Sequence, residues 1–423
     1  MAEGSSTLEA ALSGLHDIAV IGGGLIGAAA ALGAARQGWR VLLLDRTAPA
    51  WAPGELGMDL RSVAVSPASQ ALLDTLGVWP EVHAVPYTHM RVWEERGTRA
   101  IDFDAADVAR SELGWIVENG PLVALLWQRL RALDNVVVHT GDRLAGLDSA
   151  AGEIRLRLCP DTDGQRHAGL ADGREARARL VVGADGARSS VRQLLAVRAD
   201  TFDTGHHALA TVIRTSRPHD GWAYQRFLLD GPLALLPGTQ PCHSAVVWSQ
   251  PPESARRRAA LDEGGFCAEL TAATESCLGP VEAVDRRLVF PLQQMLVFSF
   301  QPDDRVLLIG DAARVLHPLA GLGANLGFED VADLLAELER LGGRGDPGLH
   351  GLWQGFARRR RWRSRLMVDL MGGLRQVYAR GDPLFQWLRN VGVGWLDAAA
   401  PVKRQIIREA LGLGPLARPP AGG

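Results

Sequence analysis

A glycine-rich turn near the start of the chain carries residue types that can hold a phosphate. Gly22, Gly24 and Gly27 follow the spacing GxGxxG between two apolar runs, and Asp45 closes the second run, VLLLD. In a βαβ unit the first glycine permits a tight turn, the second lets the backbone approach a pyrophosphate, and the third lets helix and strand pack closely. Asp45 is placed to accept a hydrogen bond from a ribose hydroxyl. The motif therefore predicts a dinucleotide site.

The helix that follows this turn is expected to contribute to the same site. Its first N–H groups have no partner within the helix and its dipole favours an anion, so we expect the phosphates there. Residues 18–35 are apolar enough to resemble a membrane span. Three consecutive glycines and a change from a strand pattern to a helix pattern argue against a span.

A second candidate site lies between residues 305 and 341. The apolar run 305–309 predicts a strand that Gly310 and Asp311 terminate, and a helix with an apolar stripe is expected from about Ala324. An aspartate at the end of a strand, beside a glycine-lined helix N-terminus, is suited to a polyhydroxyl chain. The alternative is an ordinary strand-to-helix turn, and the residues alone do not decide between the two.

Length and composition indicate a large soluble protein with two or three domains, since the chain has 423 residues. The net charge of -3 gives no reason to expect a nucleic-acid partner. The four cysteines form neither a CxxC pair nor a disulfide framework, so we expect a reducing compartment, and we expect no metal site. The first residues lack the pattern of a secretory signal, which favours a cytoplasmic location.

Patterning along the chain predicts further elements. A helix is expected over residues 122–133, and strands over residues 135–140 and 154–158, the latter antiparallel with one wet face. Residues 160–177 are polar and rich in glycine and aspartate, which indicates a loop or hairpin turn. Several strand-like runs between residues 202 and 290 predict a separate sheet.

Three distant motifs together resemble a known family. The chain carries GGGLIG at residues 22–27, GADG at residues 183–186 and GDAA at residues 310–313. In this order they resemble the single-component, FAD-dependent aromatic hydroxylases with the para-hydroxybenzoate hydroxylase fold. Within that group, the segments GWIVEN, HPLAGLGANLG and LRNVGVGWLDAAAPVKRQIIREALG are similar to the ubiquinone-biosynthesis hydroxylases. The likeness extends over roughly residues 17–412.

The resemblance implies an α/β fold: a Rossmann-like FAD-binding domain with an inserted mixed-sheet substrate domain and C-terminal helices. The domain division expected from it follows the chain order. The FAD-binding domain would comprise residues 15–85, 115–200 and 290–345, the substrate domain residues 86–114 and 201–289, and the C-terminal helical region residues 346–415.

The resemblance also implies roles for residues in the glycine motif and beyond it. Gly22, Gly24 and Gly27 would bind the FAD pyrophosphate, Asp45 the adenosine ribose and Asp311 the ribityl chain. The arginine in DLRSVAVSPAS and the last two residues of GADG match family positions as well. Arg61 would lie near the flavin phosphates, although a solvated arginine is the alternative. Asp185 and Gly186 would serve FAD and reduced nicotinamide, or form only a tight turn.

The segment after GDAA would wrap the reacting ring of the flavin. The resemblance places Pro318, Gly321, Gly323 and Asn325 around the isoalloxazine edge, where the helix N-terminus would stabilise negative charge on the reduced ring. His317 would lie close to the flavin and orient substrate or pass a proton. A structural histidine is the alternative interpretation.

The activity implied by the resemblance is hydroxylation of an aromatic ring, with NADH or NADPH as electron donor and O2 as oxidant. A prenylated phenol of ubiquinone biosynthesis would be the substrate, in a pocket that excludes water. Candidates for the pocket wall are Trp222, Phe227, Leu235, Leu236, Pro237 and Phe290, although packing in the core is the favoured interpretation for each. Two alternatives stay open: a related monooxygenase acting on another aromatic in secondary metabolism, and a non-catalytic flavin-binding accessory protein.

Four positions depart from the family pattern. Arg314 replaces the usual histidine after GDAA, Leu322 a glutamine, Gly120 an arginine and Val123 another glutamine. Arg314 is a candidate catalytic residue, because a permanent cation at the reacting edge would favour the anionic reduced flavin. The alternative is that Arg314 points outward and pairs with a carboxylate such as Glu329.

A polyprenylated substrate would place the protein at a bilayer surface or in a biosynthetic complex, so peripheral association with the inner membrane is an expectation. Residues 358–374 read either as a basic amphipathic helix for anionic lipid or as a solvated helix with a core-facing stripe. Residues 386–411 are expected to form a pair of helices.

Overall fold

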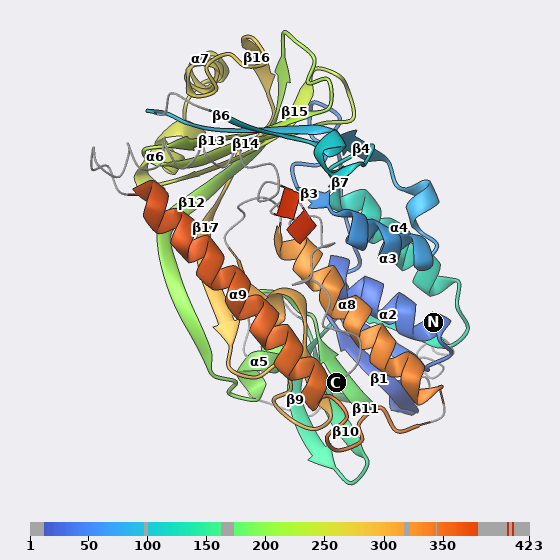
Figure 1. Ribbon diagram of the computed structural model, residues 1–423. Coiled ribbons are helices and arrows are strands. Elements are labelled where there is room, and N and C mark those ends of the chain that lie inside the picture. Colours follow the sequence, from blue (N-terminus) through green and yellow to red (C-terminus); the bar gives the residue numbers. More distant parts are fainter. Residues whose placement is uncertain are drawn as a thin grey trace.

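Two large sheets, a small one and flanking helices make up the protein (Figure 1). The computed structural model describes residues 12–96, 100–161, 173–316, 322–343, 345–379, 404–405 and 408–409. The arrangement confirms the α/β class and the Rossmann-like architecture predicted from the sequence.

The first sheet carries the glycine-rich turn. Within the described residues it has seven strands in the order β8-β2-β1-β11-β10-β9, with β18 paired to β11. Its strands are β1 (Leu15–Ile21), β2 (Val41–Asp45), β8 (Val136–Thr140), β9 (Asp142–Ala150), β10 (Glu153–Pro160), β11 (Arg174–Gly183) and β18 (Val306–Leu308). The pairs that join β8, β2, β1, β11 and β18 are parallel, and β10 pairs antiparallel with β9 and β11. Continuous apolar runs such as VLLLD suit strands that are buried on both faces.

Helices lie against this sheet and along its edges, and the longer ones that pack on it share one face (Figure 1). They are α2 (Leu25–Arg36), α3 (Pro67–Thr75), α4 (Asn119–Arg131), α5 (Ser190–Leu194), α8 (Leu322–Leu341) and α9 (Gln354–Ala379). The alanine-rich α2 lies between α4 and α8 and shares one buried apolar cluster with them. A Cβ at Gly33 would lie 2.3 Å from Cδ1 of Leu335, so small residues on α2 let α8 approach closely.

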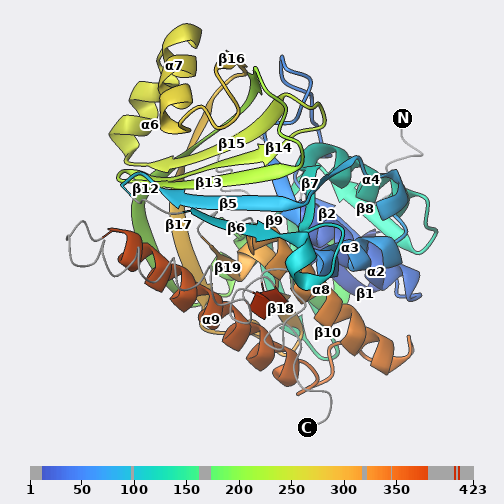
Figure 2. The ribbon, with the colours of Figure 1, turned by 45° about the horizontal axis from the view of Figure 1, so that its top comes forward.

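The second sheet is antiparallel over most of its width and covered on one face by α6 (Pro252–Ala259) and α7 (Glu263–Ala273) (Figure 2). Its order is β19-β17-β12-β15-β14-β13-β5-β6, with β16 paired to β12. Its strands are β5 (His89–Glu94), β6 (Ala100–Asp104), β12 (Ala199–Thr215), β13 (Trp222–Leu228), β14 (Gly231–Pro237), β15 (His243–Gln250), β16 (Val281–Val284), β17 (Leu288–Val297) and β19 (Arg314–Val315). The separate sheet expected between residues 202 and 290 is therefore present.

A small third sheet lies next to the start of α4. It has the order β3-β7-β4, formed by β3 (Ser62–Val65), β7 (Gly114–Glu118) and β4 (Ala84–Tyr87). Three short 3-10 helices complete the described elements: η1 (Trp79–Glu81), η2 (Ala105–Val108) and η4 (Gly310–Ala312).

Some predicted elements differ from the structure at their ends. The loop expected over residues 160–177 is wrong for its last part, because β11 begins at Arg174. Ala176 is buried there and pairs with Leu156 of β10, which extends the antiparallel ladder. Residues 162–172 lie outside the described residues, as does most of the helix pair expected over residues 386–411.

Candidate cofactor and active site

Three turns from distant parts of the chain lie side by side at one edge of the first sheet. The parallel register pairs Ile21 with Gly183, and Gly183 with Leu308. The Ala184 N–H donates to the Ile21 carbonyl at 2.7 Å, and the Ile309 N–H donates to the Gly183 carbonyl at 2.9 Å. The turns at residues 22–27, 183–186 and 310–313 therefore meet where open α/β sheets bind their ligands.

The three glycines of the first turn have different surroundings. Gly22 has φ +101°, and a Cβ there would lie 2.5 Å from the Ala184 carbonyl oxygen. A Cβ at Gly27 would lie 1.9 Å from the Gly22 carbonyl oxygen. A Cβ at Gly24, which caps the N-terminus of α2, would meet nothing within 4 Å. Gly22 and Gly27 thus serve packing, while Gly24 keeps open the space where a pyrophosphate would approach the helix.

Asp45 braces the same turn. Its carboxylate accepts hydrogen bonds from the Gly23 N–H at 2.6 Å and the Thr47 N–H at 3.0 Å. From the other side, Nε1 of Trp127 on α4 donates to the Gly23 carbonyl at 2.7 Å. Sequence reasoning missed Trp127, because a tryptophan on an amphipathic helix carries no signal of such a contact.

The GADG segment is a tight turn in which one carboxylate oxygen of Asp185 makes hydrogen bonds and the other makes none. Oδ2 of Asp185 accepts from the Ser190 N–H at 2.6 Å and from its Oγ at 2.7 Å, which caps the start of α5. Oδ1 of Asp185 is buried and has no hydrogen-bond partner. A Cβ at Gly186 would meet nothing within 4 Å. A buried acceptor beside open space fits a ligand that donates a hydrogen bond.

Asp311 lies on η4, at the carboxyl end of β18. Its side chain is exposed, yet surrounding protein raises the pKa of its carboxyl by desolvation. The cation of Arg314 opposes that shift and the charge of Asp330 adds to it. This position fits an acceptor for the hydroxyls of a ribityl chain.

Two carboxylates, buried Asp59 and half-buried Glu118, hold the loop that carries Arg61. Asp59 accepts from the Arg61 N–H at 3.0 Å and from the Gly120 N–H at 2.8 Å. Glu118 accepts from the Asp59 N–H at 2.7 Å, and burial raises the pKa of Glu118. The Arg61 side chain is exposed. Sequence reasoning did not single out Asp59 or Glu118, although GWIVEN contains the latter.

This loop also explains one departure from the family pattern. A Cβ at Gly120 would lie 2.5 Å from Cβ of Trp51 and 2.8 Å from Oδ2 of Asp59. A larger residue at this position therefore requires a different course of the loop. The second departure on α4, Val123, is buried in the apolar cluster beneath α2.

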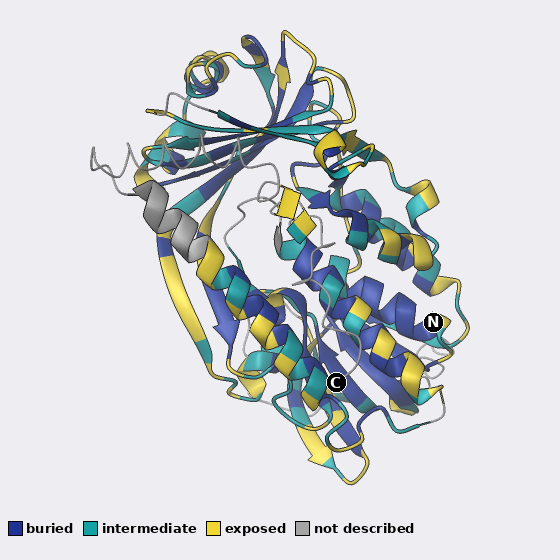
Figure 3. Cartoon of the chain, in the orientation of Figure 1, coloured by how far each residue is buried: buried dark blue, intermediate teal, exposed yellow. Residues whose placement is uncertain are grey.

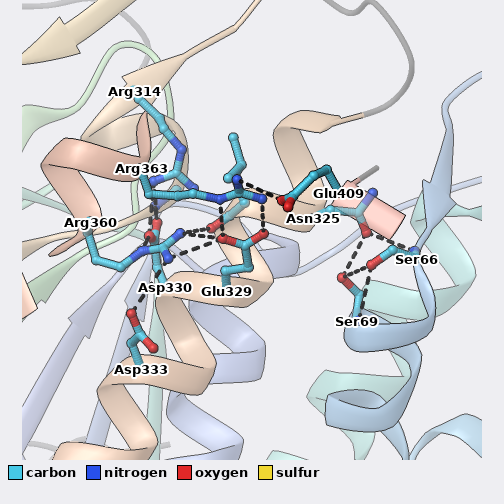
Figure 4. Close-up of polar contacts among 12 residues, drawn as sticks. Ser66, Ser69, Arg314, Asn325, Glu329, Asp330, Asp333, Arg360, Arg363 and Glu409 are labelled. Carbon is cyan, nitrogen blue, oxygen red and sulfur yellow. Dashed lines mark hydrogen bonds and ion pairs between the residues drawn. The ribbon is translucent and has the colours of Figure 1, made fainter. Parts of the chain in front are cut away.

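The start of α8 is tied to β3 and α3. Oδ1 of Asn325 accepts from the Ser66 N–H at 2.9 Å and from Oγ of Ser69 at 2.7 Å, and its Nδ2 donates to the Ala64 carbonyl at 2.8 Å (Figure 4). The side-chain amide of Asn325 thus connects the start of α8 to β3 and α3 within the protein. A Cβ at Gly323 would meet nothing within 4 Å, which leaves room for a ligand.

Arg314 faces the protein interior. Its side chain is 2% exposed, and Nη1 donates to Oδ2 of Asp330 at 2.7 Å. The alternative interpretation, in which Arg314 points outward and pairs with Glu329, is wrong, since Arg314 is buried against Asp330 and Glu329 pairs with Arg360 and Arg363. Figure 4 shows this arrangement. The side chain of Leu322 and residues His317, Pro318 and Gly321 lie outside the described part of the chain.

The second sheet presents an apolar face opposite α7. Leu209, Leu235 and Trp248 pack against Phe266 of α7 in one cluster, so the residues that alternate with them face the other way. One of these, Val212, packs against Met58 and Leu60, next to the loop of Arg61. Cross-strand pairing places the following apolar residues on this face: Ala208, Ala210, Phe227, Pro232, Ala234, Leu236, Ala245, Val247 and Phe290.

The alternation of side chains divides the candidate wall residues. Phe227, Leu236 and Phe290 lie on this apolar face, and Phe290 is 42% exposed. Trp222 and Leu235 share the opposite face, on which α7 packs. Figure 3 shows partly exposed strands along the second sheet. Sequence reasoning could not separate the two groups, because each strand is apolar on both faces.

Fold and site together define a protein that holds an extended dinucleotide at the carboxyl ends of β1, β11 and β18, beside an apolar sheet. Open space at three glycines and the orphaned Oδ1 of Asp185 fit FAD at this position. Comparisons with known proteins agree. A family described as an FAD binding domain matches residues 16–369.

The relatives are similar over nearly their whole length. The 3-demethoxyubiquinol 3-hydroxylase of Escherichia coli is 32% identical, over 94% of this chain and 98% of that protein. Ubiquinone hydroxylase UbiL of Rhodospirillum rubrum is 33% identical, over 94% of this chain and 91% of that protein. The p-nitrophenol 4-monooxygenase of Pseudomonas putida shares the fold at 20% identity, with a TM-score of 0.76 over 95% of this chain and 99% of that chain.

The chain belongs to the FAD-dependent monooxygenase family that contains these ubiquinone hydroxylases. It is an enzyme of this class, and FAD is its cofactor. In the part of the chain that the structure describes, no helix combines the length and apolar character needed to cross a membrane.

We expect Gly24→Ala and Gly27→Ala to separate ligand binding from packing. Gly24→Ala places a methyl group in open space, so the apoprotein should keep its stability within about 0.5 kcal/mol, while FAD binds at least roughly tenfold more weakly. Gly27→Ala forces backbone apart and should cost about 3 kcal/mol of unfolding free energy. Urea unfolding of apoprotein and FAD titration measure the two effects. Equal loss of stability in both variants contradicts this division.

Removing the Asp311 charge should stabilise the FAD-free protein and weaken FAD binding. The folded-state pKa of this carboxyl is raised, so its favourable contribution to stability is fully present below the unfolded pKa of about 3.9 and is lost as pH rises through the folded value. At neutral pH ionised Asp311 therefore opposes folding. We expect Asp311→Ala to increase the unfolding free energy at pH 7 but not at pH 3.

The same substitution removes a charge-assisted hydrogen bond to the cofactor, worth about 1.5–3 kcal/mol. FAD titration at pH 7 should show this loss as weaker binding. Unchanged FAD affinity would remove Asp311 from the site, and a less stable apoprotein at pH 7 would refute the electrostatic argument.

Proposed function

We propose that the protein hydroxylates the aromatic ring of a prenylated phenol in ubiquinone biosynthesis, using NADH or NADPH and O2. The observation that carries the proposal is the apolar face of the second sheet beside the FAD site. Its central side chains, including Ala234, Leu236 and Val247, offer no charge to hold an ionised substrate. Such a surface suits an uncharged ring with a hydrocarbon tail. The near full-length similarity to ubiquinone hydroxylases supports the same substrate class.

The roles of the residues follow from their surroundings. When bound, FAD supplies the redox chemistry between reduced nicotinamide, O2 and the ring. The N-terminus of α2 and the open space at Gly24 would hold the pyrophosphate, and Asp311 would accept hydrogen bonds from the ribityl hydroxyls. Asp185 would accept a further donor, and Arg61 would face the phosphates from its loop.

Residues next to the reacting ring remain part of the proposal. His317 and Pro318 follow β19 in the sequence after one intervening residue, and we assign them to the substrate side of the flavin. Gly321, Gly323 and Asn325 mark the start of α8, whose N-terminal dipole favours negative charge on the reduced ring. The burial of Arg314 favours a supporting role for this residue over direct contact with substrate.

A polyprenyl tail would require access to a lipid bilayer, and we propose peripheral association with the membrane from the cytoplasmic side. The exposed part of α9 supports this. Arg358, Arg361 and Trp362 are exposed, and the Trp362 side chain combines a polar edge with an apolar body. Arg360 and Arg363, by contrast, are buried in ion pairs and cannot reach lipid.

The proposed function predicts the effect of a charge on the apolar face. Leu236→Glu should leave FAD bound and nicotinamide oxidation active, but lower hydroxylated product per nicotinamide roughly tenfold, because the carboxylate draws water into the pocket. Leu229→Glu is the matched control, since Leu229 is 62% exposed in a turn. Mass spectrometry of the product and a peroxide assay follow the two fates of oxygen.

The aerobic assay with candidate prenylphenols also tests the function itself. Product from a prenylphenol in the unmodified protein supports the proposal. Turnover only with unprenylated aromatics would assign the enzyme to another pathway. An FAD that no phenol and no reduced nicotinamide affects would indicate a non-catalytic flavin-binding protein.

A further inference from the structure

Behind the Asp311 segment lies a group of charged side chains that the binding of FAD does not explain. We call Arg314, Glu329, Asp330, Arg360 and Arg363 the α8–α9 charge cluster (Figure 4). The side chains of Asp330, Arg314 and Arg360 are 0%, 2% and 3% exposed. Burial of so many charges is costly unless each is paired, so the cluster needs a reason beyond solubility.

Asp330 on α8 joins three separate parts of the chain. Its Oδ2 accepts from the Gly310 N–H at 2.9 Å and from Nη1 of Arg314 at 2.7 Å. Its Oδ1 accepts from Nε of Arg360 on α9 at 2.6 Å. Gly310 has φ +57°, a left-handed conformation that a fixed amide helps to hold. Asp330 therefore anchors the residue that immediately precedes Asp311.

Arginines of α9 balance the negative charge of Asp330 and of its neighbours on α8. Arg360 also reaches Oε2 of Glu329 at 3.1 Å and Asp333 at 3.5 Å, and Arg363 contacts Glu329 at 3.3 Å. Nη1 of Arg363 also lies 3.8 Å from Oε2 of Glu409, so three arginines face four carboxylates among the described residues. Loss of one partner would leave a buried charge unpaired and allow its neighbours to move.

We propose that Asp330 is a positioning residue for Asp311, and that Arg314 and Arg360 hold Asp330 in place. Helix α9 then belongs to the cofactor site without touching the cofactor. This inference rests on the proposed role of Asp311 toward FAD. Its chemical basis is local: a hydrogen-bond acceptor fixed at the Gly310 amide sets the course of η4, and η4 sets the position of the Asp311 carboxylate.

Arg314 offers a way to test the cluster without removing Asp330. Only Nη1 of Arg314 contacts Asp330, while Nε and Nη2 are buried without hydrogen-bond partners. The single ammonium group of a lysine can therefore replace the contact between Nη1 of Arg314 and Asp330. Arg314→Lys should keep FAD affinity within about twofold, whereas Arg314→Met, which leaves Asp330 short of one cation, should weaken it by about tenfold.

The decisive experiment is a double-mutant cycle on FAD affinity, measured by fluorescence titration of the apoprotein. Asp311→Ala and Asp330→Asn should each weaken FAD binding, by at least about tenfold. The double variant should bind no more weakly than Asp311→Ala, because Asp330 acts through Asp311. Asp333→Asn is the matched control, since Asp333 contacts Arg360 but is not the acceptor of the Gly310 N–H. It should keep FAD affinity.

Each other outcome has a definite meaning. Losses that add in the double variant, or an equal loss in Asp333→Asn, would overturn the inference and reduce the cluster to general stabilisation. Unchanged affinity in Asp311→Ala would instead refute the proposed cofactor role of Asp311. If Asp330→Asn does not fold, equal FAD affinity in Arg314→Met and Arg314→Lys, with apoprotein unfolding midpoints measured in parallel, would overturn the inference.

Discussion

The hydrogen bonding of β11 to β1 on one side and to β18 on the other is the constraint on which the site depends. It fixes three turns, distant in sequence, at one edge of the sheet. The fit is close, because Gly22 and Gly27 allow main-chain contacts that a Cβ would block. The open space at Gly24, Gly186 and Gly323 then remains for a ligand. Some glycines of these motifs therefore allow close packing of the main chain, and others leave space for a ligand.

The two sides of the site use opposite physical principles. On the second sheet, alternation along the strands presents apolar side chains such as Leu236 and Phe290, which disfavour water. Next to η4, buried arginines pair with carboxylates of α8, and one of these carboxylates, Asp330, accepts the hydrogen bond of the Gly310 N–H. A hydroxylase benefits from both, since its pocket must exclude water and its cofactor must stay in one place.

Three of the four departures from the family pattern have local structural reasons. Gly120 makes room for Trp51 and Asp59, and Val123 is buried in the core beneath α2. Arg314 takes part in a buried ion pair with Asp330 and is turned away from solvent. None of these positions alters the glycine-rich turn. The substitutions therefore change the protein around this turn.

The sequence by itself determined the βαβ unit, the second sheet and the family, because these depend on local periodicity, on glycine geometry and on three motifs in a fixed order. It could not determine what Asn325, Arg314 or Asp330 contact. The partners of Asn325 lie about 260 residues away, at Ser66 and Ser69, and Arg360 comes from another helix. Nor could it separate Leu235 from Leu236, since the face that α7 covers is chosen only when the sheet packs. Hydrogen-bond partners and burial are properties of the assembled fold, and only the tertiary structure decided them.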